Sequence, residues 1–213
     1  MKLVRTMSLV TLISFAVAAV GLLLCKYLLS DSFVELMFEW EIDVDYRDMR
    51  YVLGVAQPLL GMLIVLSEFA LFTSWLCVEK QQPVMSASLI ALMITTGSSL
   101  IFRFVAMLPQ MLPPTTLPTW FWSTYQIAWY VTMLMAVVAL VLLGVKMMPR
   151  SNFVGVMLCV VAVEVMVELV FSFLGLYSDW SVLANTLYWI VWPLLYLSLM
   201  LQYRTQEEMT IAE

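Results

Sequence analysis

The sequence predicts an all-α integral membrane protein, a bundle of six transmembrane helices that forms a single domain over residues 1–213. Hydrophobic residues make up 63% of the chain and charged residues 12%, whereas soluble domains contain about half and about a quarter of these classes. Six apolar stretches each reach the roughly 20 residues that a helix needs to cross a bilayer. Several connections between them are short, which favours antiparallel neighbours in a compact bundle. An ordinary water-soluble protein is excluded.

The ends of the six spans follow from where the apolar runs begin and stop. The first run is too long for the apolar region of a signal peptide, so we interpret it as a retained helix. The second contains Pro58, which is expected to kink it. Polar turns at residues 79–83, 109–116, 146–152 and 177–180 separate the later spans. The predicted transmembrane helices cover about residues 7–29, 51–77, 84–108, 120–145, 153–177 and 181–203.

Between the first two spans lies an acidic loop, residues 30–50, which we expect outside the cytoplasm. It holds seven of the 15 acidic residues and two of the 10 basic ones, so it carries the whole net charge of -5. Ser32 and Glu35 fit a capping box, and apolar residues follow at helical spacing, which predicts a short amphipathic helix on the outer surface. The acidic residues at 41–48 suggest a divalent cation site, but Arg47 and a missing glycine break the calcium-loop pattern. We interpret the loop as a solvated acidic segment.

The basic residues predict the orientation of the bundle. With both termini in the cytoplasm, the acidic loop lies outside and six of the 10 basic residues fall on the cytoplasmic side, as in a bacterial inner membrane. The acidic balance argues against nucleic acid as a partner. We expect the lipid bilayer around the chain, with a membrane protein or a second copy as candidate partner. The six basic residues are Lys2, Arg5, Lys80, Lys146, Arg150 and Arg204.

The absence of several residue types argues against most catalytic chemistry. The chain has no histidine, the commonest metal ligand and general base at neutral pH. Its cysteines, Cys25, Cys77 and Cys159, lie in three different spans without the spacing of a zinc or redox motif. The sequence also lacks a glycine-rich phosphate loop. We therefore predict that the protein is not an enzyme and that it has no resident metal centre and no cofactor.

Charged side chains inside the spans are the candidate functional residues, because each is unfavourable there unless it is paired, hydrated or neutralised. Lys26 and Arg103 are predicted near the outer headgroups, where a structural role suffices. Glu68 and Glu164 lie roughly 14 to 16 Å from the cytoplasmic ends of their helices, close to the bilayer midplane. Glu168 is one turn beyond Glu164 on the same helix face. A path from Arg103 through Glu168 and Glu164 to Glu68 is compatible with these depths.

Neighbouring carboxylates in a low-dielectric environment predict ion or solute binding. They do not both stay ionised without a cation, so one holds a proton, or the pair binds a metal ion or a cationic solute. Glu68, Glu164 and Glu168, with Arg103 as counter-charge, are therefore the predicted substrate- or ion-binding residues. The alternative is that the protonated glutamates hydrogen-bond across the bundle and only hold the helices together.

Two functional hypotheses follow from this pattern. We favour a small carrier or a substrate-binding membrane subunit for a proton, a cation or a small cationic solute. Glu68 and Glu164 lie in the middle spans of two three-span halves that run in opposite directions, an arrangement found in many carriers. The alternative is a non-catalytic accessory, assembly or sensor subunit of a membrane complex. Polar and aromatic residues such as Ser99, Trp129 and Trp192 are interpreted mainly as packing or membrane-interface residues.

Overall fold

Six long helices account for almost all of the described chain. The computed structural model describes residues 1–28, 46–111, 118–174 and 179–212, and no strand occurs in these segments. The all-α fold class is therefore confirmed. The helices are α1 (Lys2–Leu28), α3 (Tyr46–Glu79), α4 (Pro83–Met111), α5 (Thr119–Met147), α6 (Asn152–Leu174) and α7 (Asp179–Ala212).

Each helix matches a predicted span, but most continue beyond it. The start of α3 at Tyr46 includes the last five residues of the predicted acidic loop, and α7 includes the polar residues that follow position 203. A helix that has left the hydrocarbon keeps its own backbone hydrogen bonds, so its end need not coincide with the end of the apolar run. The rest of the acidic loop, with its predicted amphipathic helix, lies outside the described residues.

Five of the helices are long and apolar enough to cross a membrane: α1, α3 from Val55, α4 to Val105, α5 from Trp120, and α6. They make the chain an integral membrane protein. Among the described residues, helix α7 is not one of them. Its role as a sixth span stays a prediction, although it packs directly against the spans α1 and α6.

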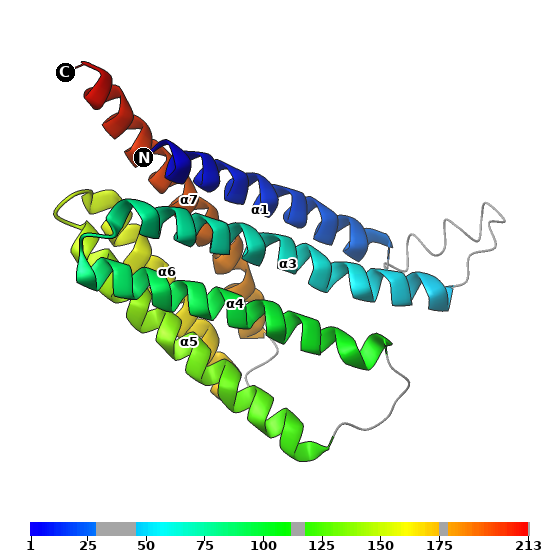
Figure 1. Cartoon of the computed structure of the whole chain (residues 1–213). Helices are drawn as coiled ribbons and strands as arrows, with labels where there is room; N and C mark the ends of the chain where they lie inside the picture. Colours follow the sequence, from blue (N-terminus) through cyan, green and yellow to red (C-terminus); the bar gives the residue numbers. More distant parts are fainter. Residues whose placement is uncertain (29–45, 112–117, 175–178, 213) are drawn as a thin grey trace.

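The helices form a closed ring in chain order (Figure 1). Each described helix contacts its two neighbours along the chain, and α7 returns to contact α1, so the pairs are α1·α3, α3·α4, α4·α5, α5·α6, α6·α7 and α7·α1. Phe15 of α1 closes this last interface, with its ring centroid 4.9 Å from that of Trp189. Gly144 and Gly155 let α5 and α6 come together so closely that a Cβ on Gly155 would lie 2.7 Å from the carbonyl oxygen of Gly144.

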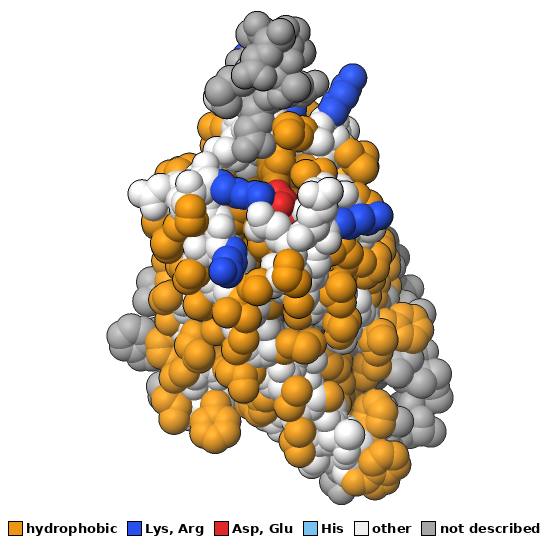
Figure 2. Space-filling model, turned by 60° about the vertical axis from the view of Figure 1, so that its left-hand side comes forward, with side chains coloured by type: hydrophobic (Ala, Val, Ile, Leu, Met, Phe, Trp, Pro, Cys, Tyr) orange, Lys and Arg blue, Asp and Glu red, His pale blue; other side chains and the backbone are white. Residues whose placement is uncertain are grey.

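Both termini and the turns α3–α4 and α5–α6 lie at one end of the ring (Figure 1), which we call the basic end. The six basic residues predicted on one side of the membrane all belong to these segments. Figure 2 shows Lys and Arg side chains gathered near this end, above a surface covered by hydrophobic side chains. Large hydrophobic residues are exposed on every helix, for example Leu23, Leu66, Ile101, Val131 and Val163. This outer surface suits contact with lipid.

A carboxylate-lined cavity as candidate functional site

A cavity of about 560 Å³ lies inside the ring, lined by residues of α3 to α7. The four predicted site residues, Glu68, Arg103, Glu164 and Glu168, all line it. Three helices therefore bring together side chains that are up to 100 positions apart in the sequence. Lys26, the other charged residue of the predicted spans, is exposed at the end of α1 and does not line the cavity.

Glu164 is held by α6 in the wall of the cavity and is only 4% exposed. Its Oε2 accepts a 3.0 Å hydrogen bond from Nε1 of Trp192 on α7. Its Oε1 is buried and has no hydrogen-bond partner among the described atoms. Buried carboxylate oxygens are normally satisfied, so Glu164 keeps one unused acceptor in the wall of the cavity.

Glu68 lies on α3 and is 5% exposed. Its Oε1 accepts a 2.5 Å hydrogen bond from the hydroxyl of Tyr196, a fully buried residue of α7. Since α1 lies between α3 and α7 in the ring, this bond joins two helices that are not direct neighbours. Tyr196 does not line the cavity, so its hydrogen bond reaches Glu68 from outside the cavity lining.

Glu168 and Arg103 stand on α6 and α4. Arg103 lies within electrostatic range of both Glu68 and Glu168. Its guanidinium packs on Gly61 of α3, where a Cβ would overlap Nη1. Within the described part of the chain, no carboxylate forms an ion pair with Arg103 within 4.0 Å. Arg103 thus offsets part of the negative charge without neutralising any one glutamate.

Hydroxyl groups of α4 form a polar strip along the cavity wall. Thr95, Thr96 and Ser99 line the cavity, and each donates to a carbonyl oxygen of its own helix at 2.8 to 2.9 Å. Their protons are therefore used, whereas their oxygens still carry lone pairs that can accept a hydrogen bond. The sequence interpretation of Ser99 as a packing residue was incomplete, since its side chain also borders this space.

Aromatic and apolar side chains form most of the remaining wall. Trp129, Tyr188 and Trp192 line the cavity, a position that the sequence allowed for these aromatic residues but ranked below interface and core roles. Tyr188 and Trp192 lie with ring centroids 6.0 Å apart. Tyr125 donates a 3.2 Å hydrogen bond to the carbonyl oxygen of Phe102, and both residues also border the cavity. The lining thus combines π-faces with carboxylates.

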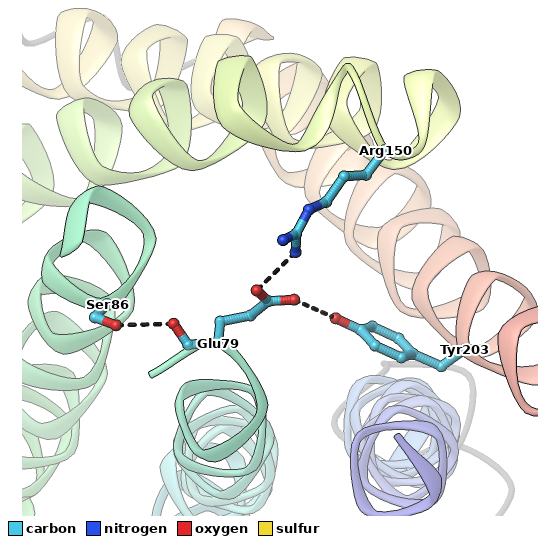
Figure 3. Close-up of polar contacts among 4 residues, drawn as sticks. All are labelled: Glu79, Ser86, Arg150 and Tyr203. Carbon is cyan, nitrogen blue, oxygen red and sulfur yellow. Dashed lines mark hydrogen bonds and ion pairs between the residues drawn. The ribbon is translucent and has the colours of Figure 1, made fainter. Parts of the chain in front are cut away.

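A second polar cluster, which the sequence did not predict, lies at the basic end (Figure 3). Glu79 ends α3, and its carboxylate accepts a 2.7 Å hydrogen bond in an ion pair with Arg150 of the α5–α6 turn. The hydroxyl of Tyr203 on α7 lies 3.4 Å from the other oxygen of Glu79, and Ser86 of α4 donates to its main-chain carbonyl. This cluster links α3, α4, α7 and the α5–α6 turn. The sequence signal for this cluster was the acidic residue Glu79, which lies among segments that are rich in basic residues.

The cavity brings acidic, basic and aromatic side chains of several helices together. Three carboxylates face one guanidinium, and one carboxylate oxygen lacks a donor. Among the described residues, no group of three His, Cys, Asp or Glu side chains is arranged to hold a metal ion. Comparisons of the chain with family models, with curated proteins and with solved structures found no match.

Proposed function

We propose that this integral membrane protein binds a cation in the cavity, as a small carrier or as the substrate-binding subunit of one, through Glu164, Glu68 and Glu168. The observation that carries this proposal is Glu164, a residue that lines the cavity and whose buried Oε1 has no hydrogen-bond donor among the described atoms. An acceptor left without a partner is unfavourable in a low-dielectric interior. A proton, an inorganic cation or an ammonium group would satisfy it.

The charges around the cavity support a cation rather than an anion. Three carboxylates and a single guanidinium give a negative balance whenever more than one carboxylate is ionised. Glu68 and Glu164 come from the middle helices of the two three-helix halves, α1–α3–α4 and α5–α6–α7. Carriers commonly hold their substrate between two such halves near the bilayer midplane. With the basic end in the cytoplasm, as proposed for a bacterial inner membrane, the cavity lies between this end and the outer face.

Reconstitution of the purified chain into liposomes with an entrapped pH-sensitive dye tests the proposal. Gradients of test cations across the membrane are expected to drive a dye signal that Glu164→Gln and Glu68→Gln abolish or reduce at least tenfold. Trp189→Phe is the control, because Trp189 packs on Phe15 and does not line the cavity. Equilibrium binding to the same variants separates a carrier from a binding subunit, which would bind cations without moving them.

Unchanged binding and unchanged flux in both glutamine variants would show that the proposal is wrong. The accessory-subunit alternative would then be favoured if a stoichiometric partner co-purifies with the chain in mild detergent.

A further inference from the structure

We infer that the preferred cation is an organic ammonium ion with an apolar body, whose N–H group donates to the carboxylate of Glu164. This inference rests on the proposed function and specifies its substrate class. It draws on three features of the cavity: its volume, its one unsatisfied acceptor, and its walls.

The volume favours an organic molecule over a bare ion. Pockets for small organic ligands commonly measure about 300 to 1,000 Å³, and this cavity measures about 560 Å³. A sodium or potassium ion needs several oxygen ligands converging on one point. The described residues provide no group of three carboxylates, cysteines or histidines arranged for a metal. A bare ion would leave most of this space to be filled by water against apolar side chains.

The polar contacts define where the ammonium group binds. Trp192 occupies Oε2 of Glu164 and so orients the carboxylate, which leaves Oε1 as the free acceptor. An ammonium group has N–H donors and carries the charge that complements this carboxylate. Glu168, one turn away on α6, adds negative charge on the same side of the cavity. A quaternary ammonium ion lacks the N–H donor and would leave Oε1 unsatisfied.

The walls around this point suit an apolar body. Trp129 and Phe171 border the cavity together with the aliphatic side chains of Val65, Leu92 and Met133. Aromatic faces also attract a cation within about 6 Å of the ring centroid. Burial of one phenyl-sized group against such walls adds a hydrophobic contribution that an inorganic cation does not have. A charged acceptor that is surrounded by apolar side chains therefore favours an organic ammonium ion.

Isothermal titration of the purified chain in detergent tests the inference with three named probes: benzylammonium, benzyl alcohol and sodium ion. Benzylammonium is expected to bind at least tenfold more tightly than benzyl alcohol, which has nearly the same shape without the charge. It is also expected to bind at least tenfold more tightly than sodium. Glu164→Gln should abolish the difference between benzylammonium and benzyl alcohol. Trp189→Phe, outside the cavity, should leave the difference unchanged.

Two further variants keep the test decisive if Glu164→Gln does not fold. Trp192→Phe keeps a ring but removes the Nε1 donor that orients Glu164, and it should weaken benzylammonium binding severalfold. Trp129→Leu removes an aromatic wall and should weaken benzylammonium more than sodium. Equal binding of benzylammonium and benzyl alcohol to the unaltered protein would overturn the inference. If sodium binds in a Glu164-dependent way and benzylammonium does not bind, the inference is overturned but the proposed function is supported. If no cation binds in a Glu164-dependent way, both are overturned.

Discussion

Replacing Tyr196 by phenylalanine isolates the contribution of one hydrogen bond that spans the ring. The substitution removes the hydroxyl that donates to Glu68 and leaves the aromatic ring, which packs 6.0 Å from the rings of Phe15 and Trp192. Tyr196 is 0% exposed and Glu68 is 5% exposed, so water has little access to replace the lost donor. Leaving a buried acceptor unsatisfied costs about 1 to 3 kcal/mol. We therefore expect Tyr196→Phe to lower the free energy of unfolding by this amount.

Tyr203→Phe provides a matched control on the same helix. Its hydroxyl lies 3.4 Å from Glu79, a distance at the limit of a hydrogen bond, and Glu79 keeps its ion pair with Arg150. The expected loss is below about 1 kcal/mol. Equilibrium unfolding in mixed micelles with an increasing fraction of sodium dodecyl sulfate, followed by circular dichroism, measures both values. Equal losses in the two variants, or no loss in Tyr196→Phe, would refute the argument that the short hydrogen bond to Glu68 contributes more to stability than the long contact to Glu79.

Three other predictions concern the framework around the cavity. Gly155→Ala should destabilise the protein by about 1 to 3 kcal/mol, because the new Cβ would meet the backbone of α5. Gly97→Ala is the control: its Cβ would lie 3.9 Å from the ring of Phe69, an ordinary contact, so stability should change by less than about 1 kcal/mol. A double-mutant cycle on Glu79 and Arg150 should give a coupling of about 0.2 to 1 kcal/mol that decreases with added salt, because the Arg150 side chain is 41% exposed; a larger, salt-independent coupling would contradict this estimate. In intact cells, a membrane-impermeant thiol reagent should not label the exposed Cys77 until the membrane is permeabilised, because the basic end is proposed to be cytoplasmic; labelling from outside would invert the orientation.

The fold could be predicted from the sequence because a membrane-spanning helix is a local property of the chain. A run of about 20 apolar residues satisfies its own backbone hydrogen bonds in lipid, whatever the rest of the protein does. The approximate positions of five spans therefore agree with the structure. The sixth predicted span, α7, stays a prediction, and the structure shows this helix packed against α1 and α6.

The candidate site could be predicted only in part. Glu68 and Glu164 were identifiable because a carboxylate in the middle of an apolar run is rare and unfavourable unless it faces the interior. Their hydrogen-bond partners, Tyr196 and Trp192, were not identified as such, because aromatic residues are frequent in the sequence and equally at home in a core or an interface. The unsatisfied oxygen of Glu164 depends on which of its two oxygens Trp192 meets. This is a property of side-chain geometry that no spacing rule contains.

The closed ring of helices has a consequence for the order in which the protein assembles. Each interface except the last joins helices that follow one another in the chain, so each new helix finds its partner already in the membrane during N-to-C synthesis. Helix α7 is the exception, since it must meet both α6 and α1. It also supplies Trp192 and Tyr196, the donors to the two central glutamates. Until α7 docks, these carboxylates lack their partners, so a helical framework can form early but the complete lining of the cavity forms only in the final step.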